Sequence, residues 1–202
     1  MSLTKKSISL ILLILFVDQA IKIWIKTHMM MGEEIQFFGK YGMIHFTENN
    51  GMAFGMELGG SWGKLFLSIF RLGAVGAIGY YMWYLIKNKS HQGLVLCIAA
   101  ILAGALGNII DSVFYGVIFS DSYYQVATLL PQGGGYAGWL QGRVVDMFYF
   151  PILQGHYPQW VPSLGGDQFI FFRPVFNTAD SAISVGVAVI LLFQKRFFGT
   201  KE

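Results

Sequence analysis

Phe176-Asn177-Thr178-Ala179-Asp180-Ser181 opens the last apolar segment of this 202-residue chain and decides its fold class. Residues 182–193 are almost wholly apolar and, with their flanks, are long enough to cross a bilayer. A carboxylate at the mouth of such a segment is costly to place beside hydrocarbon, so Asp180 is expected to have a partner or a function. Asn177 precedes it by three residues, so on a helix the two side chains share a face.

The composition of the whole chain agrees with a membrane protein. Hydrophobic residues make up 54% of the chain and charged residues 12%, with a mean hydropathy of +0.53. A soluble domain has roughly twice that charged fraction. The net charge of +3 is small and the basic residues cluster at the ends of apolar segments, so nucleic acid is not an expected partner. The single cysteine, Cys97, excludes an intrachain disulfide.

Four apolar segments are expected to span the membrane, at about residues 8–26, 62–86, 93–113 and 175–194. Lysines and arginines flank these segments mainly at the N-terminus, in the 87–91 loop and at the C-terminus, which predicts that all three regions are cytoplasmic. Residues 29–60 and 115–174 are then extracytoplasmic. The predicted fold is an all-α integral membrane protein of one domain, residues 1–202. It has four transmembrane helices, a small extracytoplasmic β-rich surface element and an enlarged extracytoplasmic loop.

The first apolar segment has two interpretations. Lys5 and Lys6 before an apolar core are also typical of a secretory signal peptide. No small-residue cleavage site follows and the apolar pattern continues past Asp18, so a retained helix is favoured. Asp18 and Lys22 are four residues apart with the carboxylate first, the favourable order for a helical ion pair. Such a pair either neutralises the helix for insertion or belongs to a functional site.

The two outer connections differ in character. Residues 35–38 and 43–46 are strand-like and are separated by glycines, which predicts a small sheet at the membrane surface. The longer connection is rich in glycine and in aromatic residues, which suit the headgroup level. Its stretches 115–141 and 151–173 are expected to form a flap over the site, an interfacial platform or tolerated loop insertions.

Polar side chains from different segments are predicted to converge at one depth. Asp18 and Lys22 lie in the outer half of the first segment, and Asp146 lies in the outer connection. The third and fourth segments place the following residues near their outer ends: Asn108, Asp111, Asn177 and Asp180. Polar residues that only neutralised charge within their own helices would rarely lie at a single depth. The sequence therefore predicts a functional site at the outer membrane–water boundary.

The chemistry of this site is expected to come from carboxylates. The four histidines show no metal-ligand spacing, so neither a zinc site nor another cofactor is expected. When two aspartates share a semi-buried site, one keeps a proton while the ionised one can deprotonate a water molecule. These residues alone leave open an aspartic protease, a small transporter with a proton relay, and a non-catalytic scaffold. A transporter would call for polar residues spread through the bilayer.

Five short motifs in order give the chain a family resemblance. They are D-Q-x-x-K at 18–22, N-x-G-x-A-F at 49–54, G-A-L-G-N-x-x-D at 104–111, V-V-D at 144–146 and F-N-x-A-D-S at 176–181. Together, over residues 8–195, the chain resembles bacterial lipoprotein signal peptidase (signal peptidase II). The resemblance implies a monomeric aspartic endopeptidase of the bacterial inner (cytoplasmic) membrane, surrounded by membrane lipid. Its substrate would be a diacylglyceryl-modified prolipoprotein, cut on the N-terminal side of the lipidated cysteine.

The same resemblance implies roles for individual residues. It places the catalytic pair on Asp146 and Asp180. It assigns substrate binding or site support to Asp18, Lys22, Asn49, Gly51, Asn108, Asp111, Arg143 and Asn177. The family usually has an arginine where this chain has Ser112, so Arg71 or Arg143 is expected to supply that charge. Asp146 follows two β-branched residues in an extended stretch, which predicts that it lies nearer water than Asp111.

Overall fold

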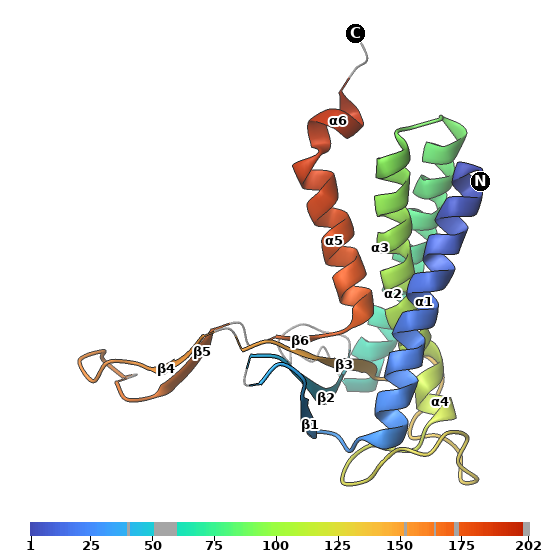
Figure 1. Ribbon diagram of the computed structural model, residues 1–202. Coiled ribbons are helices and arrows are strands. Elements are labelled where there is room, and N and C mark those ends of the chain that lie inside the picture. Colours follow the sequence, from blue (N-terminus) through green and yellow to red (C-terminus); the bar gives the residue numbers. More distant parts are fainter. Residues whose placement is uncertain (40, 51–59, 152, 164, 172–173, 200–202) are drawn as a thin grey trace.

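Four long helices form a bundle with a small sheet at one end. The computed structural model describes residues 1–39, 41–50, 60–151, 153–163, 165–171 and 174–199. Its longest helices are α1 (Leu3–His28), α2 (Gly60–Lys87), α3 (Gln92–Ile110) and α5 (Thr178–Leu192). Figure 1 shows both termini at one end of the bundle and the strands at the other. The short helix α6 (Gln194–Phe198) follows α5 at the end that carries the termini.

Three helical stretches are long and apolar enough to cross a membrane: Leu3–His28, Trp62–Lys87 and Gln92–Ile118. The third exceeds α3 because a π-helical turn, η2 (Asp111–Tyr115), and the short helix α4 (Gly116–Ile118) continue it. Helix α5 is also apolar but shorter, with 15 residues. The chain is therefore a mostly helical membrane protein, and the crossing of the bilayer by α5 as a fourth span stays a prediction.

The central helix α3 packs against α1, α2 and α5. Small residues let α3 and its neighbours approach closely, as is usual between helices in a membrane. A Cβ atom placed on Gly104 would lie 2.3 Å from the carbonyl oxygen of Ala179 on α5. A Cβ atom on Gly107, one turn further along, would lie 2.7 Å from Asp18 Oδ2 on α1. The two glycines therefore bring α1, α3 and α5 together at the end where the polar residues lie.

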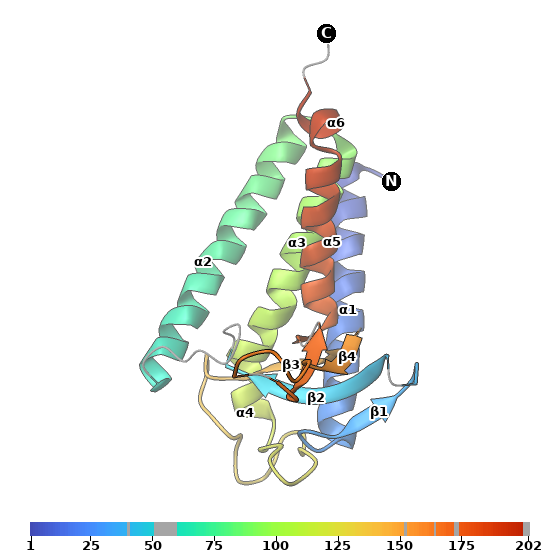
Figure 2. The same cartoon turned by 90° about the vertical axis from the view of Figure 1, so that its left-hand side faces the viewer.

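A four-stranded antiparallel sheet lies beside the lower end of α1, at the end of the bundle opposite the termini (Figure 2). Its order is β1 (Glu34–Gln36), β2 (Met43–Asn49), β3 (Val144–Tyr149) and β6 (Val175–Phe176). Strands β1 and β2 overlap the two predicted strand-like stretches. The sheet is larger than the sequence suggested, because the long connection contributes β3 and β6 to it.

Side chains alternate along β3, so Val145 and Met147 lie on one face of the sheet and Asp146 lies on the other. Val145 and Met147 are fully buried in a core cluster with Phe46 of β2 and Ile25 of α1. Asp146, between them, points to the opposite face because successive side chains of a strand alternate. Thr47 pairs with Asp146 in the β2–β3 register, and Asn49 pairs with Val144. Asn49 is thus a diagonal neighbour of Asp146 on the polar face.

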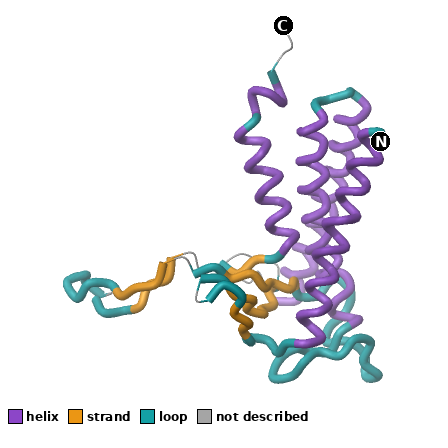
Figure 3. Tube along the Cα trace, in the orientation of Figure 1, coloured by secondary structure: helices purple, strands orange, loops and turns teal. Residues whose placement is uncertain are grey.

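The two extensions of the long connection behave differently. Residues 115–141 wrap around the end of α1, where the Ala127 backbone N–H donates to the Lys26 carbonyl at 3.1 Å. The described residues of 151–173 form a hairpin, β4 (Leu153–His156) and β5 (Gln168–Phe171). This hairpin projects sideways from the sheet, away from the helices (Figure 3). Its described part therefore does not lie over the ends of the helices as a flap.

The close approach of α3 and α5 gives a stability prediction. Gly104→Ala forces a methyl group against the Ala179 carbonyl oxygen, and we expect overpacking to lower the free energy of unfolding by about 1–3 kcal/mol. Gly76→Ala on α2 is the matched control, because its Cβ atom would meet nothing within 4 Å. Thermal denaturation of both variants in detergent measures the difference. Equal melting temperatures would contradict the close packing described for α3 and α5.

Candidate active site

Lys22 is a fully buried cation with three oxygen partners. Its Nζ lies 3.0 Å from Asp18 Oδ2 and 2.8 Å from Asp111 Oδ2, and it donates to Asn108 Oδ1 at 2.9 Å. The side chains of Asp18, Lys22 and Asp111 have no exposed surface. Because burying a charge is costly unless it is paired and hydrogen-bonded, this arrangement satisfies all three hydrogens of the ammonium group. It joins α1 to the end of α3.

Further hydrogen bonds tie this ion pair network to neighbouring elements. Gln19 Nε2 donates to Asp111 Oδ1 at 3.0 Å and to Asp18 Oδ2 at 3.1 Å, and its Oε1 accepts from the Tyr115 hydroxyl at 3.0 Å. Asp18 Oδ1 accepts from the Ala179 backbone N–H at 2.9 Å. Asp111 Oδ2 also accepts from the Val145 backbone N–H at 3.2 Å. The network therefore fixes the start of α5 and the strand β3.

Asn177 holds Asp146 and Asp180 in one site. Its side chain caps α5 by accepting from the Asp180 backbone N–H at 2.9 Å, while Asp180 Oδ2 accepts from the Asn177 backbone N–H at 3.3 Å. This reciprocal capping box positions Asp180 in the first turn of the helix. The Asn177 Nδ2 then donates to Asp146 Oδ1 at 2.6 Å. One buried amide thus contacts both predicted catalytic residues.

Two further amides complete the arrangement. Asn108 Nδ2 donates to Asp180 Oδ1 at 2.8 Å, and its Oδ1 accepts from Lys22 and, at 3.1 Å, from Asn177 Nδ2. Asn49 Nδ2 donates to Asp146 Oδ2 from the neighbouring strand β2. Neutral amide donors therefore orient the carboxylates of Asp146 and Asp180. Asn108 also connects Asp180 to Lys22, because it bonds both side chains.

Burial and like charge change the acidity of Asp146. The side chain belongs to β3, an interior strand of the sheet, and Asp146 is only 4% exposed. Burial, together with the nearby charge of Asp180, raises the pKa of Asp146 to about 7, although the hydrogen bond from Asn177 acts in the opposite direction. A carboxyl group with this pKa can hold a proton near neutral pH. Paired carboxyl groups with different environments are typical of acid–base catalysis.

The exposure of the aspartates to water does not follow the simple order that the sequence predicted. The sequence placed Asp146 nearer water than Asp111, but both are buried, with exposures of 4% and 0%. Asp180 is the half-buried member of the group. Asp146 is buried where the side chains of Asn177, at the start of α5, and Asn49 of β2 contact its carboxylate, which an isolated extended stretch would not provide. Asp111 differs from Asp146 in its partners, because Asp111 forms an ion pair with Lys22 whereas neutral amides of Asn177 and Asn49 donate to Asp146.

A second polar network lies on the other face of the sheet. Lys26 is fully buried, forms an ion pair with Glu48 and donates to Ser122 Oγ at 2.9 Å. Arg143 Nη1 lies 3.0 Å from Glu48 Oε2 and 3.1 Å from Asp121 Oδ1. The Arg143 guanidinium also lies 4.6 Å from the ring centre of Tyr136. These contacts place Arg143 in this network and not among the contacts of Asp146 and Asp180.

The remaining predicted residues have distinct positions. Ser112 is buried and donates to the Asn108 carbonyl at 3.0 Å, so it supports the helix end. Arg71, half-buried on α2, interacts electrostatically with Asp180, Asp146 and Asp111. Of the two arginines considered for the missing charge, Arg71 is therefore the one whose charge interacts with these aspartates. Gly51 lies outside the described residues.

Sequence reasoning did not assign Gln19, Lys26 or Glu48 to a site. Gln19 stood within the D-Q-x-x-K motif, and its position beside Asp18 was the available signal. Lys26 follows Lys22 by four residues, so it lies on the same face of the helix and was open to detection by spacing. Glu48 gave no such signal, because its partners come from distant parts of the chain. Within the described ranges, no three His, Cys, Asp or Glu side chains form a group that could hold a metal ion.

The chain is similar to known proteins over almost its whole length. Residues 10–196 match the family model described as signal peptidase (SPase) II. The lipoprotein signal peptidase of Porphyromonas gingivalis is 52% identical over 189 residues, covering 93% of this chain and 82% of the relative. That of Amoebophilus asiaticus is 38% identical, covering 91% and 75%. A solved bacterial membrane enzyme superposes with a TM-score of 0.63 at 26% identity, covering 97% of this chain and 95% of its own.

The charge balance around Lys22 gives a prediction for stability. Lys22→Met leaves Asp18 and Asp111 buried without their shared cation, and we expect a loss of about 3–5 kcal/mol in the free energy of unfolding. Adding Asp18→Asn and Asp111→Asn removes the two unpaired charges and should restore part of this loss. Chemical denaturation in detergent compares the single and triple variants. A triple variant less stable than Lys22→Met would argue against charge pairing as the source of the stability.

Proposed function

Because the chain belongs to the signal peptidase II family of lipoprotein signal peptidases, an aspartic-type hydrolase family, we propose that Asp146 and Asp180 are its catalytic pair. The observation that carries this proposal is the Asn177 side chain, which caps the helix of Asp180 and donates to Asp146. It brings residues from a strand and a helix, separated by a long connection, into one constellation. The supporting residues are Asp18, Lys22, Asn49, Asn108, Asp111 and Asn177.

The proposed mechanism uses water as the nucleophile. One carboxyl group holds a proton because two like charges in a semi-buried site do not easily ionise together. We assign that proton to Asp146, whose pKa burial and Asp180 raise to about 7. Asp180, half-buried, is then the base that takes a proton from water. As water adds, Asp146 donates its proton to the carbonyl oxygen of the scissile bond, which gives a gem-diol. When the C–N bond breaks, Asp180 gives the proton that it took from water to the leaving amine, and a hydroxyl of the gem-diol returns a proton to Asp146.

Arg71 is proposed to assist the reaction through its charge. It interacts with Asp180, Asp146 and Asp111, so its charge favours ionisation at the site. Ser112, which occupies the position where the family usually has arginine, is bonded to backbone and has no charge. An arginine on α2 thus supplies the positive field from another element. No metal ion or cofactor enters this mechanism.

The proposed substrate is a prolipoprotein that carries diacylglycerol on the cysteine after the cleavage site. Its signal helix spans the bilayer, so the cysteine arrives near the outer membrane surface. Four spans, with both termini cytoplasmic in the bacterial inner membrane, place the aspartates at that depth. The acyl chains then remain in lipid and add binding energy through their buried methylenes. A monomer is sufficient, since one chain supplies every proposed residue.

A transporter remains the rival function for buried charges in a membrane protein. It would need polar residues through the depth of the bundle. In the described residues the buried carboxylates lie near the sheet, at the end of the bundle opposite the termini (Figure 1). This concentration at one end supports a site for a reaction at the membrane surface over a transmembrane relay.

The catalytic assignment predicts the behaviour of asparagine variants. Asn keeps the shape of Asp but can neither accept the proton nor carry the charge. Asp146→Asn and Asp180→Asn should each lower the cleavage rate at least about 100-fold, a typical contribution of acid–base catalysis. Release of the signal peptide from purified diacylglyceryl-modified prolipoprotein, with EDTA present, measures the rate.

Asp111→Asn is the matched control, because Lys22 and Gln19 already engage this carboxylate. We expect lower stability and at most a partial loss of activity. Thermal denaturation of each variant in detergent separates folding from chemistry. A folded Asp111→Asn protein without activity, beside an active Asp146→Asn protein, would transfer the catalytic role to Asp111.

The pKa of Asp146 predicts the alkaline side of the pH profile. Its proton is present below about pH 7 and is lost as the pH rises through that value. Since the mechanism needs this proton, kcat/KM should fall above about pH 7, approaching tenfold per pH unit, while the protein stays folded. Initial rates between pH 6 and 9 test this. A constant kcat/KM over that range would show that Asp146 is not the proton donor.

A further inference from the structure

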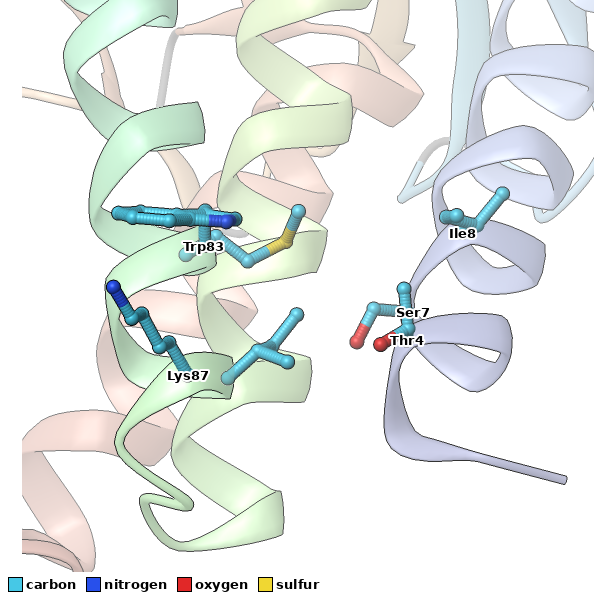
Figure 4. A pocket seen from close by; sticks show the side chains of 7 residues that line it. Thr4, Ser7, Ile8, Trp83 and Lys87 are labelled. Atoms are coloured by element: carbon cyan, nitrogen blue, oxygen red, sulfur yellow. The ribbon is translucent and has the colours of Figure 1, made fainter.

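A groove lies between the first turns of α1 and the last turns of α2, at the end of the bundle opposite the aspartates (Figure 4). Its volume is about 390 Å³, which lies at the lower end of the range for ligand pockets. Helix α1 contributes Ser7 and Ile8, and α2 contributes Met82, Trp83, Ile86 and Lys87. The peptidase mechanism does not use any of these residues.

The groove exists because α1 and α2 both pack against α3. Their facing side chains near the termini leave large apolar surfaces accessible: Ile8 is 49% exposed and Trp83 is 51% exposed. In a bilayer, such a groove is filled by hydrocarbon and not by water. The apolar part of its lining therefore suits an acyl chain.

The mouth of the groove is cationic. The Lys87 Nζ lies 4.9 Å from the ring centre of Trp83, and no carboxylate among the described residues pairs with it. The described residues at this end of the bundle, 1–10, 82–95 and 190–199, contain no Asp or Glu. They contain the following cations: Lys5, Lys6, Lys87, Lys89, Lys195 and Arg196. The charge at this end is therefore complementary to an anion.

We propose that this groove binds a phospholipid with an anionic headgroup, taken from the leaflet in which the two termini lie. Lys87 contacts the phosphate, and an acyl chain lies along Ile8, Met82 and Ile86. Basic pockets between transmembrane helices bind anionic lipid headgroups in this way. A substrate signal helix is a poorer occupant, because its cationic first residues would meet the lysines at this end. The bound lipid fills the space between α1 and α2 and holds their ends together.

Native mass spectrometry of the purified full chain tests this binding with two lipids of identical acyl chains. We expect phosphatidylglycerol adducts to form at lower lipid concentration than phosphatidylcholine adducts. Lys87→Gln should weaken phosphatidylglycerol binding about fivefold, the contribution of one lysine near an anionic surface. Ile8→Trp, which fills the groove, should weaken binding of both lipids. Lys89→Gln is the matched control, because it removes a nearby charge that does not line the groove.

Cleavage of prolipoprotein by these variants is expected to stay unchanged, since the groove and the aspartates lie at opposite ends of the bundle. A negative result for lipid binding would therefore leave the peptidase assignment unaffected, and a negative result for cleavage would leave the lipid site unaffected. Equal binding of the two lipids by the wild-type protein would overturn it. So would Lys87→Gln and Lys89→Gln proteins with the same affinity for phosphatidylglycerol, because the charge would then act from the whole surface and not from this groove.

Discussion

The burial of the Lys22 ammonium group is the constraint on which the rest of the structure depends. A charge without access to water is tolerated only when oxygen atoms surround it, and here Asp18, Asp111 and Asn108 supply them. These partners come from α1 and α3, while Asp18 and Asn108 also bond residues at the start of α5. A shift of α1 against α3 would leave Asp111 unpaired, and a shift of α5 would break the hydrogen bonds that tie it to Asp18 and Asn108. The ion pairs therefore select one arrangement of the bundle, which apolar contacts between helices in lipid would not do alone.

The same network leaves a different environment for Asp146 and Asp180, the proposed catalytic pair. Lys22 bonds Asp18 and Asp111 directly, whereas Asn49, Asn108 and Asn177 orient Asp146 and Asp180. A bonded ammonium would favour ionisation of both carboxyl groups and prevent them from sharing a proton. Neutral amides fix their positions without removing their mutual repulsion. The proposed separation of structural from catalytic aspartates follows from the partner that each carboxylate has, because Asp111 and Asp146 are both buried and differ in having an ammonium or an amide partner.

Apolar length and motif order were sufficient to predict the helices and the residues that converge with Asp180. The Asp18–Lys22 pair and the Asn177–Asp180 spacing were visible because helical neighbours lie three or four residues apart. Contacts between residues on different elements were not visible in the sequence. Lys22 with Asp111, and Asn49 with Asp146, depend on helix packing and on strand register, and neither can be derived from local periodicity. Strands β3 and β6 were missed for a similar reason, because a short strand in a long connection is defined by its partner.

The enlarged connection also acquires a physical role from its position. Asn49 and Glu48 are adjacent on β2, so their side chains point to opposite faces of the sheet. Asn49 holds Asp146 on one face, and on the other Glu48 is held by Lys26, Ser122 and Arg143. Ser122 belongs to the connection, and Arg143 stands at its junction with β3. Because Glu48 is held on the opposite face of the sheet, the backbone that carries Asn49 has less freedom to move. The orientation of Asp146, to which Asn49 donates, is restricted as well. The residues of the connection that follow α4 therefore belong to the support of the site, because the strand between the two networks is held from both faces.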